Sequence, residues 1–370
     1  MSGLHINDSP RMTAALVEAG AFRKQPFTVV DVGARGGIAS YWSVFADDLR
    51  IVGFDLDPQE CRRLNAIDLR TRYLPFALDR RKGRRAVYVA NHAASSSFYR
   101  SDPAYFGRYT ASQNATVLSE QTLETTTLSS ALASIGLTAA DFIKVDAEGA
   151  ELEILQGGED LLPSVQGVLS EVRFSRKISG CPVYWELEKY LREQSFELYD
   201  LDVYRLSRKA LPYPYLYSNY FDDGRPAAGP STQGQVFEAN ALYMRDLLDT
   251  SPDARRLVVA ACLFEIFGLS DCAAELIQAH GSTFDSLVPV QTLLDLLVPE
   301  VKGRSLTYRQ YMDRDLVADP LLRPADGRRF PESVIPQYDG EFAASWEDKR
   351  VVKDSFWQRL LARFGGSIPR

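Results

Sequence analysis

The sequence predicts an α/β fold built on a doubly wound, mostly parallel β-sheet. Up to Arg245, strand-like runs alternate with helical patterns, which is typical of a parallel sheet covered by helices. Three of the runs, at 27–32, 50–56 and 141–146, are almost continuously apolar. Such runs are expected for strands that are buried on both faces of the sheet.

The predicted elements follow in a regular order. Strands are expected at 27–32, 50–56, 72–78, 86–91, 141–146, 166–172, 196–206 and 235–245, and helices at 13–22, 60–69, 128–135, 150–156 and 185–193. The strand at 86–91 follows its neighbour across a short basic turn, so we expect a hairpin strand added to the sheet. The other strands give a seven-stranded sheet.

The pattern changes after residue 246. We expect residues 1–246 to form one domain, with a long Tyr- and Pro-rich loop at 207–234 before the last strand. Loops of this length inside a compact domain are uncommon and often functional. Residues 247–370 are expected to form a mainly helical C-terminal appendage that caps the pocket, forms a homodimer or docks a partner.

Composition excludes several classes of protein. Apolar residues make up 45% of the 370 residues and charged residues 25%, as in ordinary globular proteins. No run of apolar residues is long enough to span a membrane, and the first residues do not resemble a signal peptide, so we expect a cytoplasmic protein. A net charge of −7 argues against a nucleic-acid partner. The four cysteines are far apart, which predicts reduced thiols.

A glycine-rich turn, VVDVGARGG, follows the first strand directly. A dinucleotide-binding turn needs G-x-G-x-x-G, but Arg35 and Ile38 stand where its second and third glycines belong. The sequence instead has an acid-x-Gly-x-x-x-Gly pattern formed by Asp31, Gly33 and Gly37. Such a turn lets the backbone approach a ligand that has no pyrophosphate. A plain tight turn is the alternative.

A second acidic residue, Asp55, ends the next strand in GFDLDP. A carboxylate at this position can accept hydrogen bonds from both hydroxyls of a ribose. The alternative is that Asp55 or Asp57 caps the following helix. Because an acid follows each of two consecutive strands, we favour a ligand site.

Several segments together resemble the FkbM-type, S-adenosylmethionine-dependent methyltransferases of the Rossmann-like class I group. They are DVGARGG, GFDLDP, TTLSSAL and DFIKVDAEGAELEILQGGEDLL, of which IKVDAEGAE is the most specific. The resemblance covers roughly residues 25 to 245. It implies a seven-stranded methyltransferase sheet, S-adenosyl-L-methionine as the cofactor and S-adenosyl-L-homocysteine as the product.

The resemblance also implies a set of cofactor-binding residues. The methionine end would be lined by Asp31, Gly33, Ala34 and Gly37, the ribose held by Asp55, and the adenine flanked by Leu56, Ala77, Leu78 and Asp79. Arg35 belongs to the same turn, where the family often has Asn. The serine motif HAASSSFY adds Ser96 and Ser97 as pocket residues, with Ser97 toward the cofactor and Ser96 toward the substrate.

Acidic residues after the strand at 141–146 are the predicted catalytic groups. In a doubly wound sheet, Asp146 would face the same crevice as Gly33 and could hold the cofactor or act as a base. Removing the proton of a hydroxyl acceptor accelerates transfer by roughly 10²–10⁴-fold. Glu148 is the next candidate, with helix-dipole complementation as its alternative role, and Glu171 would complete an acidic rim at the substrate.

Three further residues are predicted near the acceptor. His92, just before the serine motif, is the histidine placed to act as a base, with a surface histidine as the alternative. Tyr215 and Tyr217, in the long loop, would present ring faces to a substrate; alternatively they pack against the domain. Whether the acidic residues also hold a divalent metal is left open, and no metal ligand is assigned.

The resemblance implies O-methylation of a hydroxyl on a sugar, a glycan or a related metabolite by in-line methyl transfer. Two alternatives stay open: an N-methyltransferase that acts on a peptide or small molecule, and a non-catalytic interaction protein with the same fold. The cofactor-binding residues Asp31, Gly33, Asp55 and Asp146 are all present, which disfavours the non-catalytic protein.

Overall fold

The computed structural model describes residues 4–109, 112–175, 180–210, 234–248, 252–299 and 305–312. Tyr215 and Tyr217 lie outside these ranges, as does the chain from 313 onward. The described residues up to Pro299, together with Leu306–Tyr308, belong to one compact unit. Both sheets and the candidate site belong to this unit.

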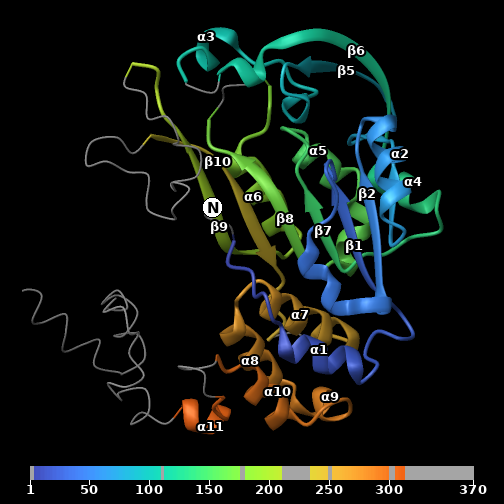
Figure 1. The fold of residues 1–370 in the computed structure, drawn as a ribbon, viewed down its shortest axis with the longest axis vertical. Helices are drawn as coiled ribbons and strands as arrows, with labels where there is room; N and C mark the ends of the chain where they lie inside the picture. Colours follow the sequence, from blue (N-terminus) through green and yellow to red (C-terminus); the bar gives the residue numbers. More distant parts are fainter. Residues whose placement is uncertain are drawn as a thin grey trace, which may run out of the picture. The chain divides into compact units, whose positions relative to one another are not determined.

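The predicted seven-stranded sheet is confirmed, with strand order β3-β2-β1-β7-β8-β10-β9 (Figure 1). Strands β1, β2, β3, β7 and β8 run parallel, and β10 is antiparallel to both β8 and β9. The strands are β1 (Phe27–Val32), β2 (Leu49–Phe54), β3 (Thr71–Leu74), β7 (Phe142–Val145), β8 (Gly167–Arg173), β9 (Glu197–Leu206) and β10 (Gln235–Met244).

Helices cover both faces of this sheet. The α-helices of the first 200 residues are α1 (Arg11–Glu18), α2 (Pro58–Ile67), α3 (Pro103–Phe106), α4 (Leu128–Ala133), α5 (Glu151–Gln156) and α6 (Tyr184–Glu193). Along β1, Phe27 and Val29 enter one hydrophobic core, whereas Val30 and Val32 enter the other. Successive side chains of a strand point to opposite faces, so both faces of β1 are buried, as its apolar sequence predicts.

A second, three-stranded sheet corrects one expectation. Strands β4 (Ala77–Leu78), β5 (Gly83–Ala90) and β6 (Val117–Thr126) form it in the order β4-β6-β5. The strand expected at 86–91 therefore pairs with β6 and is not added to the main sheet. Strand β6 escaped prediction because residues 118–122 are all exposed, so no apolar alternation marks it.

Further helices follow residue 253. They are α7 (Ala254–Ile266), α8 (Ser270–Ala279), α9 (Gly281–Asp285), α10 (Val290–Leu297) and α11 (Tyr308–Tyr311). Helices α7 and α10 pack against α1 at the lower end of the view in Figure 1, and α8 packs against both of them. Helix α7 is buried at every residue from Leu257 to Ile266. A domain boundary at residue 246 stays a prediction. Among the residues described, every helix is too short or too polar to cross a membrane.

A buried carboxylate joins α7 to α1. Glu265, 1% exposed, accepts hydrogen bonds from the backbone N–H groups of Met12 (2.9 Å) and Thr13 (2.6 Å). It also accepts one from the Thr13 hydroxyl at 2.7 Å. The first N–H groups of a helix have no partner within the helix, so Glu265 satisfies donors that α1 would otherwise bury.

Glu265→Ala should therefore lower the free energy of unfolding by about 2 kcal/mol or more, because it leaves two buried N–H groups unpaired. Urea denaturation measures this loss. Glu18→Ala, at an exposed position on α1, is the control and should change stability by no more than about 0.5 kcal/mol. Equal stability of the two variants would contradict the role of Glu265.

Candidate active site

The crevice lies where the strand order reverses. Strand β1 pairs with β2 on one side and with β7 on the other, so the chains leaving β1 and β7 diverge and open a space at their carboxyl ends. The backbone holds the turn after β1 tightly: Gly33 and Ala34 both donate hydrogen bonds to the Phe54 carbonyl oxygen at 2.9 Å.

Gly33 and Asp146 meet at this point. A Cβ atom at Gly33 would lie 1.9 Å from the Asp146 carbonyl oxygen, and Gly33 has φ +82°. The Asp146 N–H donates to the Val32 carbonyl oxygen at 3.0 Å. The structure thus brings together the glycine turn and the acidic segment that sequence analysis placed in one crevice. Only glycine fits here, because any side chain would displace the Asp146 backbone.

Lys144, on β7, bridges the two turns and was missed by sequence analysis. Its Nζ lies 3.3 Å from Asp31 Oδ1 and 3.5 Å from Asp146 Oδ2, and it donates to the Gly33 carbonyl oxygen at 3.3 Å. The available signal was a lysine inside an otherwise apolar strand. A half-buried lysine at such a position needs carboxylate partners.

Asp31 has the environment of a ligand-binding carboxylate. It is 6% exposed, and its burial raises the pKa to about 6, although the ammonium of Lys144 opposes this shift. Its Oδ1 is buried and is paired with the Lys144 ammonium at 3.3 Å. A carboxylate has acceptor sites on both oxygens, so Asp31 can also accept a hydrogen bond from the cofactor's amino group. Asp31 therefore fits the role that sequence analysis gave it.

At the end of β2, the sequence left open whether Asp55 is a ligand for a ribose or whether Asp55 or Asp57 is the cap of the following helix. Asp57 caps α2, since its Oδ1 accepts from the Gln59 N–H at 2.8 Å. Asp55 is 8% exposed, and burial raises its pKa. Asp55 accepts hydrogen bonds from the Asp57 N–H at 2.7 Å and from Arg35 at 3.4 Å, both through Oδ1. Its other oxygen is thus the one available to a ribose.

Of the remaining predicted cofactor residues, some belong to these turns and others to the second sheet. Gly37 has φ +109° and lies near the Tyr73 hydroxyl, while Ala34 is buried against Cys61, Leu64 and Tyr73 and so supports the turn from behind. Leu56 is half-buried. Ala77 and Leu78 form β4 and are buried, and Asp79 forms an ion pair with Arg85 at 3.0 Å.

The turn after β7 contains a second constrained backbone. Glu148 has φ +55°, which is uncommon for a residue with a side chain, and Gly149 has φ +113°. The Glu151 side chain bridges two backbone groups of this turn. Its Oε1 accepts hydrogen bonds from the N–H groups of Ala147 and Gly149, both at 2.9 Å. From the second sheet, the Ser97 hydroxyl donates to the Glu148 carbonyl oxygen at 2.6 Å. These bonds fix where the Glu148 side chain points.

Arg173, at the end of β8, holds the carboxylates together and was also missed by sequence analysis. Its Nη2 lies 2.7 Å from both Glu148 Oε2 and Glu171 Oε2, and its Nη1 lies 3.8 Å from Glu151 Oε2. Burial raises the pKa of Glu148 to about 8 and that of Glu171 well above its usual value, with Arg173 opposing both shifts. The signal was an arginine at the end of a buried strand, in LSEVRF.

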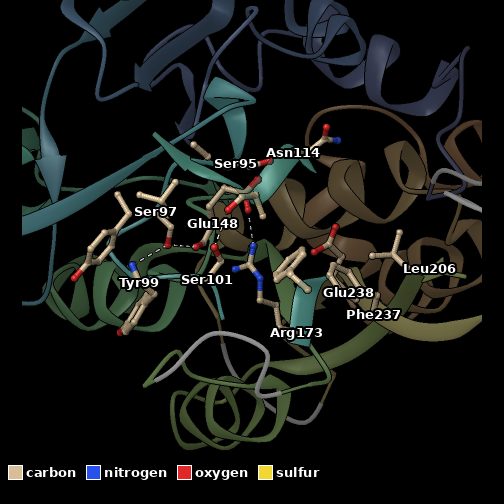
Figure 2. Close-up of a pocket in the computed structure, with 15 residues that line it drawn as sticks. Ser95, Ser97, Tyr99, Ser101, Asn114, Glu148, Arg173, Leu206, Phe237 and Glu238 are labelled. Atoms are coloured by element: carbon tan, nitrogen blue, oxygen red, sulfur yellow. Dashed lines mark hydrogen bonds and ion pairs between the residues drawn. The ribbon is translucent and has the colours of Figure 1, made fainter. Parts of the chain in front are cut away.

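A pocket lies between this cluster and the second sheet (Figure 2). The described residues that line it are Tyr88, Ala90, Ser95, Ser97, Tyr99, Ser101, Phe106, Asn114, Ala115, Val117, Glu148, Arg173, Leu206, Phe237 and Glu238. Ser97 and Glu148 therefore share the pocket, and Glu171 adjoins it through Arg173. Ser96 accepts a hydrogen bond from the Ala90 N–H, and His92 is exposed at the start of the 3₁₀ turn Ala93–Ser95.

The cation between the acidic residues is the guanidinium of Arg173. Within the described ranges, no group of three or more His, Cys, Asp or Glu side chains has the arrangement of a metal site. The position between Glu148 and Glu171 is occupied by Arg173 Nη2. These two carboxylates are therefore paired with a side chain of the protein itself.

The fold is Rossmann-like, and the crevice at its topological switch point has two buried carboxylates, Asp31 and Asp55, and a tight glycine turn. The family follows from the sequence: residues 31–198 match the methyltransferase FkbM domain. The chain thus carries an FkbM-type domain and is an S-adenosylmethionine-dependent methyltransferase. The predicted family resemblance is confirmed.

Solved structures with a similar fold include several methyltransferases. A TehB-like S-adenosylmethionine-dependent methyltransferase from Corynebacterium glutamicum is 13% identical, with 64% of this chain and 88% of that chain covered and a TM-score of 0.27. Human methyltransferase-like protein 13, in complex with S-adenosylhomocysteine, is 13% identical, with 70% and 89% covered and a TM-score of 0.30. No curated protein matches the sequence. The family assignment therefore comes from the FkbM domain.

Gly33→Ala should destabilise the protein more than Gly36→Ala. Both glycines have left-handed backbones (φ +82° and +85°), so each substitution costs about 1–2 kcal/mol in backbone strain. Only the Gly33 substitution also meets the Asp146 backbone, whereas a Cβ at Gly36 meets nothing within 4 Å. Urea denaturation compares the two variants. Equal losses of stability would show that the two turns are not in contact.

Asp55→Ala should weaken S-adenosylhomocysteine binding by about tenfold or more, the loss expected for a hydrogen bond to a charged group. Isothermal titration calorimetry measures the change. The matched control is Asp57→Ala, which removes the cap of α2 and should cost about 1 kcal/mol of stability while leaving affinity nearly unchanged. Wild-type affinity in Asp55→Ala would remove Asp55 from the cofactor site.

Proposed function

We propose that this methyltransferase transfers the methyl group to a hydroxyl oxygen of a sugar, a glycan or a related metabolite. The observation that supports this most is the Glu148 carboxylate, which lines the pocket and has a pKa raised to about 8. A hydroxyl acceptor must lose its proton as the new bond forms, and a base works best when its pKa is near the operating pH.

In this proposal the cofactor-binding residues adjoin Asp146, which lies in the same turn after β7 as Glu148 and contacts Gly33. Asp31 would pair with the cofactor's amino group, the tight turn at Gly33 would lie against its methionine end, and Asp55 would accept hydrogen bonds from its ribose hydroxyls. When bound, the cofactor supplies an electrophilic methyl group on a sulfonium. The contribution of the protein is to align the acceptor oxygen with that group, since alignment supplies much of the rate of an in-line displacement.

Glu148 takes the acceptor's proton in this proposal. Its carboxylate is at the pocket, and its backbone is fixed by Ser97 and, through the closed turn, by Glu151. Asp146 differs, because its side chain is 40% exposed and lies 3.5 Å from Lys144 Nζ. We therefore place Glu148 first as the base, and Asp146 as the residue that positions the turn beside the cofactor.

The pH profile tests this assignment. Only the ionised carboxylate can accept a proton, so kcat should rise with pH and level off above about pH 8. Glu148→Gln should lower kcat by roughly 10²–10⁴-fold and abolish this pH dependence. Glu120→Gln, an exposed residue on β6, is the control and should keep the wild-type profile. An unchanged profile in Glu148→Gln would contradict the role of Glu148.

The methylated atom is identified by incubating the protein with isotopically labelled S-adenosylmethionine and a panel of saccharides and glycans. Nuclear magnetic resonance of the product should place the label on an oxygen. A label on nitrogen, in any acceptor that turns over, would overturn O-methylation and leave the methyltransferase assignment intact.

A further inference from the structure

The three consecutive serines of the motif HAASSSFY have different surroundings. Ser97 is 5% exposed, and its hydroxyl donates to the Glu148 carbonyl oxygen at 2.6 Å and accepts from the Tyr99 N–H at 3.0 Å. The Ser96 hydroxyl accepts from the Ala90 N–H at 3.1 Å. Both hydroxyls are therefore bonded to the backbone of the protein itself.

Ser95 differs from the two serines that follow it. Its N–H donates to the His92 carbonyl oxygen at 2.8 Å, which fixes its place at the end of the 3₁₀ turn. Its side chain is half-buried and lines the pocket, whereas Ser96 is not among the described residues that line it. Within the described part of the chain, the Ser95 hydroxyl has no hydrogen-bond partner. It therefore offers the pocket one donor and two acceptor lone pairs.

Glu148 lines the same pocket (Figure 2). Arg173 Nη2 contacts Glu148 Oε2 at 2.7 Å, which leaves Glu148 Oε1 for the hydroxyl of an acceptor. The two polar groups come from different parts of the fold, since Glu148 lies in the turn after β7 and Ser95 in the turn after β5. An acceptor that reaches both must carry two polar groups.

The chemistry of Ser95 indicates which second group it takes. A serine hydroxyl is neutral and can donate and accept, and a second hydroxyl has the same properties. A charged group would gain more from a partner of opposite charge. The aromatic residues Tyr88, Phe106 and Phe237 line the pocket as well, so it also has apolar surface for the carbon atoms of a ring.

We propose that Ser95 binds a second hydroxyl of the acceptor while Glu148 takes the proton of the hydroxyl that is methylated. The acceptor is then a ring with several hydroxyls and not a simple alcohol. Holding a hydroxyl that does not react orients the one that does. This inference rests on the proposed function, because it takes Glu148 as the base. It gives the substrate contact to Ser95, where sequence analysis expects Ser96.

Ring alcohols with one or two hydroxyls test this contact. Cyclohexanol, trans-cyclohexane-1,2-diol and cis-cyclohexane-1,3-diol are titrated into the full-length protein saturated with S-adenosylhomocysteine, and their affinities are measured by saturation-transfer nuclear magnetic resonance. We expect at least one diol to bind about threefold to tenfold more tightly than cyclohexanol, the gain from one neutral hydrogen bond. Ser95→Ala should remove this preference and leave the affinity for cyclohexanol unchanged.

Two further serine variants assign the contact. Ser96→Ala should keep the preference for the diol, because the Ser96 hydroxyl bonds the Ala90 N–H. Ser119→Ala, at an exposed position on β6, is the control and should also keep it. Thermal denaturation verifies that each variant is folded. A preference that survives in Ser95→Ala, or that is lost only in Ser96→Ala, would overturn the assignment.

Kinetics separate the role of Ser95 from that of Glu148. With the acceptor that turns over in the labelling experiment, Ser95→Ala should raise KM about threefold to tenfold and keep the wild-type pH dependence of kcat. The reason is that Ser95 binds a hydroxyl that keeps its proton. A changed pH dependence with an unchanged KM would contradict this role.

The outcomes distinguish this inference from the proposed function. A label on nitrogen, together with a diol preference that depends on Ser95, would overturn O-methylation and keep the Ser95 contact. A label on oxygen, with no diol preference in the wild-type protein, would overturn this inference and leave the proposed function intact. If none of the three rings binds, the pocket does not take a ring alcohol and the inference falls.

Discussion

The site depends on the close approach of two backbone turns, one at Gly33 and one at Asp146. Their separation leaves no room for a Cβ atom, and the hydrogen bond from the Asp146 N–H to the Val32 carbonyl fixes it. Lys144 adds an electrostatic link, since one ammonium contacts Asp31, Asp146 and the Gly33 carbonyl. The residues proposed for cofactor binding and for acceptor chemistry thus lie at one corner of the sheet.

Residues of the second sheet form one wall of the pocket beside these turns. Ser97 hydrogen-bonds the Glu148 carbonyl, and Glu151 holds the N–H groups on either side of it, so the left-handed backbone of Glu148 is supported from two directions. Strained backbone of this kind persists where the surroundings over-determine it, and it is frequent at active sites. Arg173 then holds the Glu148 carboxylate at the pocket, where it can receive a proton.

Sequence reasoning identified the architecture and the carboxylates better than it identified the cations. The seven strands, the glycine turn and the acids Asp31, Asp55 and Asp146 follow from buried runs and from the geometry of parallel sheets. Lys144 and Arg173 could not be assigned, because their importance depends on which acids the fold brings near them. Strand β6 was missed because its exposed residues carry no alternation, and only the structure separates the helix cap, Asp57, from Asp55.

The most direct test of the central claim is a calorimetric titration of the full-length protein with S-adenosylhomocysteine, with NADH as the control ligand. The crevice between Gly33, Asp55 and Asp146 predicts micromolar binding of S-adenosylhomocysteine and no binding of NADH, since the turn lacks two of the glycines that a pyrophosphate requires. Binding of neither ligand by folded protein, or binding of NADH, would contradict the account.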